Sequence, residues 1–216
     1  MAKAKKPNIS ARKKPRQTRS VKLVADILEA AIRVLVRDGA YRFTTARVAE
    51  AAGVSVGSLY QYFPNKQAIL FRLQANEWGQ TMSQLERILG DRNLLPTQRI
   101  RSAIRTFFRS ECDEAAFRSA LEEAAPLYRE APESRAHAED GRQLMERFMR
   151  DALPHSSARE RAFAADLVGV VMSSVGKTIS VQNRSRSEVD ALADAVADMF
   201  CAYLEGEIAL GRPKSC

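Results

Sequence analysis

The sequence predicts an all-α protein of about nine helices. Glycine and proline are scarce, at 10 and 8 of 216 residues, and no long stretch alternates with period two. Ala, Leu, Glu and Arg, which favour helices, dominate instead. Hydrophobic residues make up 45% of the chain, which is enough for a core and argues against a wholly disordered protein. The chain contains no run of 18 apolar residues, so no membrane-spanning helix is predicted.

The net charge of +8 is concentrated at the N-terminus. Residues 1–19 contain eight of the 34 basic residues and no acid, so residues 20–216 hold 26 of each sign. We expect 1–19 to be a flexible basic arm whose Lys13, Lys14, Arg16 and Arg19 suit a polyanionic partner. A solubilising tail and an organelle transit peptide are the alternatives. The chain lacks the apolar segment of a secretory signal, which predicts a cytoplasmic protein.

The first half of the chain is clearly divided into helices. An apolar stripe at helical spacing covers 20–37, and Asp38-Gly39 ends it, with Gly39 suited to a left-handed conformation. Two short helices are expected at 45–52 and 55–62, with Thr44 and Ser55 as N-caps. Asn65 is the expected cap of a long fourth helix that reaches about Leu89.

The second half is expected to hold five more helices. Pro96 fits the first turn of one of them, Pro126 kinks or ends another, and Ser157 and Ser185 each precede a glutamate at capping-box spacing. The expected ranges are about 96–111, 114–129, 133–152, 157–182 and 187–209.

The segment 43–66 predicts a helix-turn-helix. Two helices of two turns each are not stable alone, so they must pack on helix 20–37. Inward contacts would come from Val48, Ala49, Leu59 and Phe63, and Gly53 allows the sharp turn between the helices.

The other face of helix 55–62 would point outward. Its first turn is small and polar, so it can enter a major groove, and Gly57 lets the backbone approach closely. Gln61 can read adenine, Ser58 can donate or accept, and Tyr60 and Tyr62 can reach phosphates or thymine methyls. The alternative is that the tyrosines are core aromatics; because Leu59 and Phe63 take the inward positions, we expect at least Tyr60 to point out.

These residues resemble the tetracycline-repressor (TetR) family of bacterial regulators over about 20–75. The matching residues are Thr44-Thr45, Val48-Ala49, Ala52-Gly53-Val54-Ser55, Gly57-Ser58-Leu59-Tyr60, Tyr62-Phe63 and Asn65-Lys66. The resemblance implies a homodimer with a helix-turn-helix DNA-binding domain at 20–66 and a helical ligand-binding and dimerisation domain at 67–216. It implies that Thr45, Ser55, Tyr62 and Lys66 contact phosphates. The implied DNA-binding set is completed by Thr44, Val56, Gly57, Ser58, Tyr60 and Gln61.

Two further surfaces are predicted in the helical remainder. Bulky apolar residues could line a ligand pocket, although ordinary core packing is the alternative for each: Trp78, Phe107, Phe108, Phe117, Met145, Phe148, Met149 and Met172. Apolar stripes on the last two long helices could form a four-helix dimer interface rather than pack within one subunit. The residues expected there are Phe163, Leu167, Val171, Ser174, Leu192, Val196, Met199 and Tyr203.

The sequence shows no catalytic, metal or cofactor motif. Neither of the two histidines has a second ligand at metal spacing, and the three cysteines form no CxxC pair. An enzyme with a helical body is one rival interpretation, and a protein that binds DNA or membranes only through its arm is another. The prediction is a transcriptional repressor, not an enzyme, that a small apolar or aromatic ligand releases from a palindromic operator.

Overall fold

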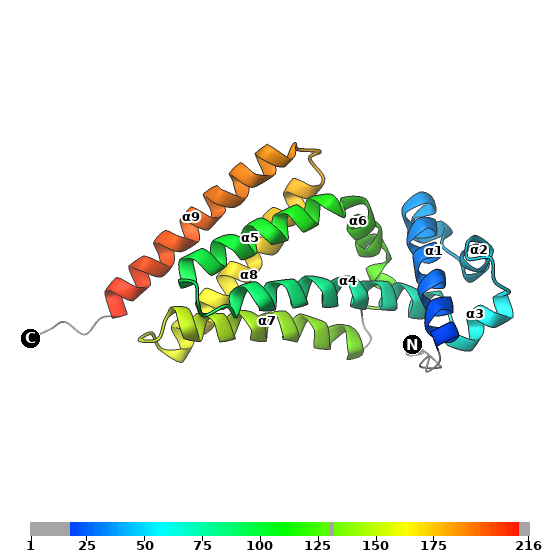
Figure 1. The fold of residues 1–216 in the computed structure, drawn as a ribbon, viewed down its shortest axis with the longest axis horizontal. Coiled ribbons are helices and arrows are strands. Elements are labelled where there is room, and N and C mark those ends of the chain that lie inside the picture. The colour runs from blue at the N-terminus through cyan, green and yellow to red at the C-terminus, as the bar shows by residue number, and fades with distance from the viewer. Residues whose placement is uncertain (1–17, 130–131, 212–216) are drawn as a thin grey trace, which may run out of the picture. The chain divides into compact units, whose positions relative to one another are not determined.

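The structure, a computed structural model, describes residues 18–129 and 132–211, with side-chain surroundings for 19–129 and 139–207. These residues form helices and no strands, which confirms the predicted all-α class (Figure 1). The elements are α1 (Thr18–Arg42), α2 (Thr45–Ala51), α3 (Val56–Tyr62), α4 (Lys66–Leu89), α5 (Pro96–Asp113), α6 (Ala115–Ala124), a 3₁₀ turn (Ala125–Leu127), α7 (Pro132–Ala152), α8 (Ala158–Ser180) and α9 (Arg186–Gly211).

The expected boundaries hold within two residues except at the C-terminal ends of α6, which stops at Ala124 before the 3₁₀ turn and not at 129, and of α1. This helix begins at Thr18, so Arg19 lies in its first turn and not in the basic arm as expected. At its other end, α1 continues to Arg42 across a kink at Gly39. Gly39 has the expected positive φ of 72°, but its ψ of 170° lies outside the left-handed helical region, so the chain bends there without a helical cap.

The chain forms two compact units, and their limits differ from the expected boundary at Lys66. The first unit comprises Met1–Trp78 and Ala116–His137, and the second comprises Gly79–Ala115 and Ala138–Cys216. Helix α4 contributes residues to both, and α6 belongs to the first unit although it follows α5 in the chain. Sequence periodicity identifies helices but does not tell which of them share a core.

Helix α6 is held in the first unit by apolar and polar contacts. Leu121 and Tyr128 are at most 3% exposed and belong to the same apolar cluster as α1 and α3. Arg118 forms a largely buried ion pair with Glu77 of α4, with 2.8 Å between Nη2 and Oε1. Gln74 donates to the other oxygen of Glu77 over 3.1 Å, so this carboxylate joins α4 to α6. Such a pair is costly to break, because either partner alone would be a buried charge.

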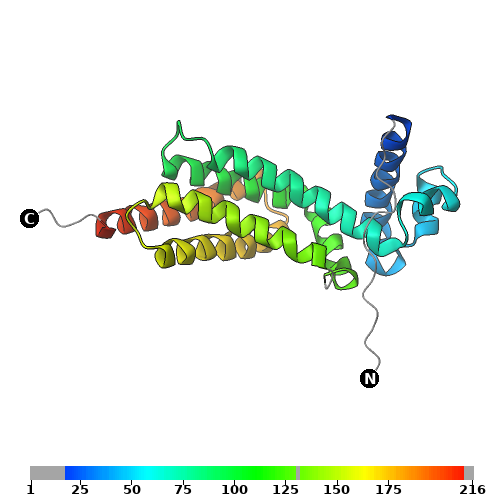
Figure 2. The ribbon, with the colours of Figure 1, turned by 90° about the horizontal axis from the view of Figure 1, so that it is seen from below.

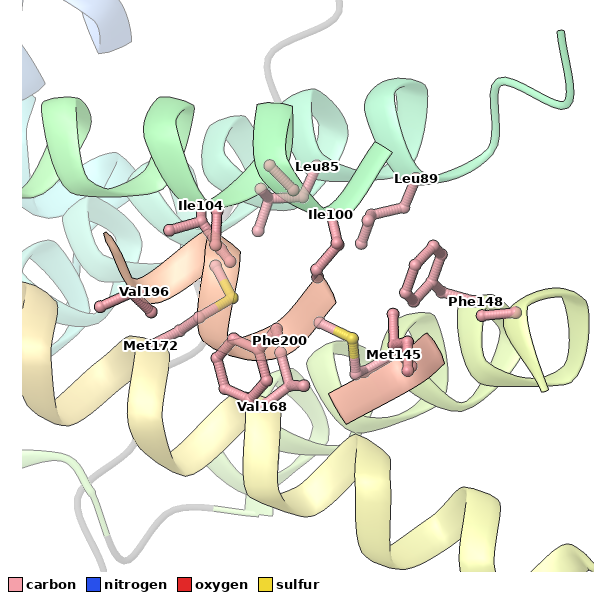
Figure 3. Packing of buried hydrophobic residues seen from close by; sticks show 14 of the residues in the cluster. Leu85, Leu89, Ile100, Ile104, Met145, Phe148, Val168, Met172, Val196 and Phe200 are labelled. Atoms are coloured by element: carbon pink, nitrogen blue, oxygen red, sulfur yellow. The ribbon is translucent and has the colours of Figure 1, made fainter. Parts of the chain in front are cut away.

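The second unit is a helical bundle (Figure 2), and its buried side chains form one apolar core. Helix α5 packs against both α8 and α9. Side chains from α4, α5, α7, α8 and α9 converge in this core, as Figure 3 shows for Leu85, Ile104, Phe148, Met172 and Phe200. The bundle therefore buries residues from every helix that contributes to the unit.

One buried cation joins three helices of this bundle. Arg99 of α5 is 3% exposed and donates to the carbonyl of Leu89, the last residue of α4, over 2.8 Å. Its guanidinium also pairs with Asp151 of α7 and lies 5.4 Å from the centre of the Phe148 ring. These partners compensate for much of the desolvation of the charge, so Arg99 fixes the corner where α4 ends and α5 begins.

Helix α8 crosses α5 closely at a glycine. A Cβ atom on Gly176 would lie 2.9 Å from Cε1 of Phe107 and 3.1 Å from Cγ of Glu111. Both distances are shorter than ordinary contacts between carbon atoms, so the crossing requires a residue without a side chain.

We expect Gly176→Ala to lower the free energy of unfolding by about 1–2 kcal/mol, because steric overlap outweighs the helix propensity of alanine. Gly79→Ala on α4 is the matched control: nothing lies within 4 Å of its Cβ position, so the substitution should stabilise the protein. Thermal unfolding shows whether each variant raises or lowers the Tm. Equal Tm shifts in the two variants would contradict a tight crossing at Gly176.

Candidate functional site

Helices α2 and α3 depend on α1 for their support. Each has seven residues, too few for an isolated helix to be stable in water. Val48 of α2 and Leu59 and Phe63 at α3 are at most 1% exposed. They share an apolar cluster with the inner face of α1, which includes Ile27, Leu28, Ala31, Val34 and Leu35. Burial on α1 therefore fixes where both short helices lie, as the helix-turn-helix prediction required.

The two short helices begin at the expected caps. The Thr44 hydroxyl accepts from the backbone N–H of Arg47 over 3.3 Å, and the Ser55 hydroxyl accepts from the N–H of Ser58 over 3.0 Å. Between them, Gly53 has a φ of +65°, a conformation that side chains rarely allow. These three residues confirm the predicted cap–turn–cap pattern and set the direction of α3.

Polar contacts from α1 hold both ends of α2. The Asp38 carboxylate, just before the kink of α1, accepts from Arg47 over 2.7 Å and from Arg37 over 2.8 Å. Its hydrogen bonds to Arg37 and Arg47 hold the pKa of Asp38 well below its usual range. At the other end, Arg33 donates to the carbonyl of Ala51 over 3.3 Å. From the sequence, Asp38 was predicted only as part of a helix stop; the arginine nine residues later was the available signal of this contact.

The outward face of α3 is exposed as expected. Val56 and Tyr60 are 40% and 39% exposed, Gly57 and Gln61 are exposed, and Ser58 is half-buried. The Tyr60 hydroxyl lies 3.1 Å from the Thr45 hydroxyl of α2, close enough for a hydrogen bond. This contact limits the motion of the Tyr60 ring and joins the outer surfaces of the two helices.

Tyr62 does not lie on that face, which corrects the prediction. It is 6% exposed and belongs to the apolar cluster with Leu59 and Phe63. The inward stripe of α3 thus takes positions i, i+3 and i+4, whereas only the first and last were predicted to face the core. Because its ring is buried, Tyr62 is not exposed for the expected phosphate contact.

The remaining predicted DNA-binding residues surround α3. Thr44 is exposed, Thr45 and Lys66 are half-buried, and Asn65 caps α4 by accepting from the N–H of Ala68 over 2.8 Å. Arg19 is exposed on α1, while Lys13, Lys14 and Arg16 lie outside the described residues. The first turns of α2, α3 and α4 carry no acidic residue, so nothing there repels a phosphate.

The predicted pocket residues are divided between the two units. Phe108, Met149 and four others share the core of the second unit: Phe107, Met145, Phe148 and Met172. Phe117 packs instead against the core of the first unit, and Trp78 also belongs to that unit. All eight are bulky and apolar, so the sequence pattern does not indicate that they belong to two different units.

The predicted dimer residues differ in exposure. Phe163 of α8 and Met199 of α9 are 64% and 66% exposed, and Ser174 is exposed. Leu167, Val171, Leu192 and Tyr203 are half-buried against the core of the second unit. Val170 is 56% exposed and lies seven residues from Phe163 on the same side of α8. Exposed apolar side chains therefore remain on both helices.

Val196 does not belong to this exposed set. It is 9% exposed and lies within the buried stripe of α9, between Ala193 and Phe200. The apolar residues of α9 are spread around the helix, so the sequence could not tell the core side from the outer side.

Two further observations concern membrane-spanning helices and metal ligands. Helix α8 alone among the described helices is long and apolar enough to span a membrane, with mean hydropathy 1.4, but a single such helix also occurs in soluble bundles. Within the described residues, no three His, Cys, Asp or Glu side chains are grouped as metal ligands.

Comparison with protein families decides the class of this helix-turn-helix. Residues 95–206 match the family model "Tetracyclin repressor-like, C-terminal domain", and residues 27–73 match "Bacterial regulatory proteins, tetR family". The chain belongs to the TetR family. It is therefore a DNA-binding transcriptional regulator, and α3 is the second helix of its helix-turn-helix, the position termed the recognition helix.

The individual proteins that resemble this TetR-family chain match only part of it or have low sequence identity to it. The Fatty acid metabolism regulator protein of Bacillus subtilis (strain 168) is 35% identical over 60 residues, which are 28% of this chain and 31% of that protein. The match thus spans about a third of that relative.

Two solved structures share the TetR fold with this chain at low identity. FadR of Bacillus subtilis in complex with stearoyl-CoA is 17% identical with a TM-score of 0.63, and the match covers 82% of this chain and 96% of that one. SmeT in a complex with triclosan is 22% identical, also with a TM-score of 0.63, over 84% and 91%. At these identities the similarity shows the common fold alone.

The Ser55 cap allows stability and DNA binding to be separated. Ser55→Ala should destabilise the TetR protein by about 1 kcal/mol, because the N–H of Ser58 loses its acceptor. Ser55→Asp should keep the cap and the stability but weaken DNA binding, because a carboxylate then faces phosphates. Ser55→Asn, a neutral cap, is the control. Thermal unfolding and fluorescence anisotropy with duplex DNA measure the two effects; full DNA affinity in Ser55→Asp would remove this residue from the interface.

Proposed function

We propose that this TetR-family regulator is a cytoplasmic, homodimeric repressor that leaves a palindromic operator when a small apolar or aromatic ligand binds its helical body. The observation that carries the proposal is the outer face of α3. Val56, Gly57, Tyr60 and Gln61 are exposed there, on a helix whose other side is fixed to α1. A rigid support with a small, uncharged outer face is what the major groove admits.

Each outer residue has a chemical role at the operator. The Gln61 amide can make two hydrogen bonds to an adenine, and Val56 can contact a thymine methyl. Tyr60, held by Thr45, presents its hydroxyl and ring edge at a fixed position. Ser55, Thr45 and Lys66 would bind phosphates, which sets the register of α3 on the duplex without reading sequence. Tyr62 supports this face from inside and makes no direct contact.

A homodimer follows from the small size of the recognition helix. One seven-residue helix reads only a few base pairs, so useful specificity needs two copies about 34 Å apart on one side of the duplex. The exposed Phe163 and Val170 of α8 and Met199 of α9 supply an apolar surface for the second copy. The same surface accounts for the apolar character of α8 without a membrane.

The core of the second unit supports an apolar effector. Met145, Met149 and Met172 lie among phenylalanines there, and methionine adapts to irregular apolar ligands. The stearoyl-CoA and triclosan complexes of similar folds favour a long acyl chain or an aromatic compound as the first ligands to test. Such a ligand can release DNA only if it binds the DNA-free shape of the dimer more tightly than the bound shape.

The operator experiment tests the recognition face. We expect Gln61→Ala to lose about 1–3 kcal/mol of specific binding, and Tyr60→Phe to lose less, in anisotropy titrations with DNA from upstream of the protein's own gene. Gln84→Ala, an exposed glutamine on α4, is the control and should bind as the wild type does. DNA of scrambled sequence should bind the wild type and Gln61→Ala equally. An unchanged operator affinity in Gln61→Ala would reject the outer face of α3 as the reading face.

The dimer experiment tests the second copy. Phe163→Glu should shift the protein towards monomers in sedimentation velocity, since a charge in an apolar interface loses its hydration. Operator affinity should fall with it, while the fold remains because Phe163 is 64% exposed. Leu95→Glu, at a leucine that is 65% exposed between α4 and α5, should leave the dimer intact. A monomeric wild type would contradict the proposal outright.

Effector release uses the same anisotropy assay. Stearoyl-CoA or triclosan should free the operator at concentrations where coenzyme A without an acyl chain does not. If neither probe releases DNA, the effector belongs to another chemical class and the recognition face is unaffected.

A further inference from the structure

Helices α5 and α9 are joined by four ion pairs in regular order, here termed the charge ladder. Three pairs place an arginine of α5 opposite an aspartate of α9: Arg101–Asp198, Arg105–Asp194 and Arg109–Asp190. The fourth is reversed, with Asp113 on α5 and Arg186 on α9, and its atoms are 3.5 Å apart. Successive pairs are four residues apart on both helices, which therefore run antiparallel along one continuous seam.

The reversed pair is unfavourable for both helices taken singly. Asp113 is the last residue of α5, where the helix dipole favours a cation, and Arg186 is the first residue of α9, where it favours an anion. Arginine at 113 and aspartate at 186 would satisfy both dipoles and still form an ion pair. The observed order thus needs a reason other than local helix stability.

Sliding α9 along α5 supplies that reason. A slip by one turn in one direction places Asp190 opposite Asp113, and a slip in the other direction places Arg186 opposite Arg109. Either slip keeps two attractive pairs and creates one repulsive pair, whereas the observed register has four attractive pairs. With the fourth pair reversed to match the others, a slipped helix would keep three attractive pairs and meet no repulsion.

Apolar packing alone discriminates less between these registers. A slip of four residues moves Val189 to the place of Ala193, Ala193 to that of Ala197 and Phe200 to that of Leu204. Each exchange replaces one buried apolar residue with another, so only a mismatch in side-chain shape opposes the slip. Charge patterns, by contrast, oppose a wrong pairing through repulsion, as they do in coiled coils.

We propose that the charge ladder sets the register of α9 on α5, with Asp113 and Arg186 as the positioning residues that exclude the slipped arrangements. The register decides which residues of α9 face outward beside Met199. Its consequence for pairing with a second copy rests on the proposed homodimer, but the register itself belongs to a single subunit.

Single charge reversals test the register directly. Asp113→Arg makes the fourth pair repulsive but creates an attractive pair with Asp190 in one slipped register. Arg186→Asp also makes the fourth pair repulsive, and it creates an attractive pair with Arg109 in the opposite slipped register. The readout is the distance between nitroxide labels on exposed Ser102 and Ser187, in a chain with alanine at its native cysteines and diluted with unlabelled chain. One helical turn rises about 5.4 Å, which this spin–spin measurement resolves.

We expect Asp113→Arg to lengthen this distance and Arg186→Asp to shorten it. The double variant Asp113→Arg/Arg186→Asp should return to the wild-type distance with a Tm above that of the wild type, because both helix dipoles are then satisfied. Exchanging the charges of Glu139 and Arg142, a pair within α7, is the control and should move nothing.

The proposal is overturned if both single variants keep the wild-type distance or move it in the same direction. If a single variant fails to fold, the double variant decides, since a Tm below that of the wild type also overturns the proposal. The measured distance lies within one subunit, so a monomeric chain would refute the homodimer and leave this result standing.

Discussion

The proposed DNA-binding surface depends on burial of two short helices against α1. Neither α2 nor α3 can form a stable helix alone, and each gains its structure from a few side chains in one apolar cluster. The exposed face of α3 is consequently a by-product of its buried face: once Leu59, Tyr62 and Phe63 are fixed inward, Tyr60 and Gln61 must point outward. Substitutions in the cluster would therefore affect DNA binding without touching DNA.

Electrostatic contacts refine this arrangement without creating it. Asp38 joins α1 to α2 through Arg47, and Glu77 joins α4 to α6 through Arg118. The first pair is partly exposed and contributes modestly, while the second is largely buried and is costly to break. Arg99 has a similar role in the second unit, where its partners come from α4 and α7. In each case a charge fixes the angle or register of helices that apolar contacts have already brought together.

Local signals in the sequence were sufficient for the helices and for most of the recognition helix. Thr44, Gly53 and Ser55 act through their immediate neighbours, so their roles could be predicted from spacing alone. Tyr62 could not, because its burial depends on a partner helix and not on α3. The same limit applies to Val196 and Phe117: only the folded chain determines that Val196 lies on the core side of α9 and that Phe117 packs against the core of the first unit. The charge ladder was also missed, because its partners are 73 or more residues apart.

The position of α6 has a consequence for synthesis of the chain. Leu121, Ala124 and Tyr128 complete the core of the first unit, yet residues 79–115 of the second unit are translated before them. The ribosome must therefore extend well past the recognition helix before that core can close, which takes seconds at ordinary elongation rates. A gene fragment ending after α3 would therefore encode a recognition helix whose supporting core lacks the side chains that α4 and α6 contribute.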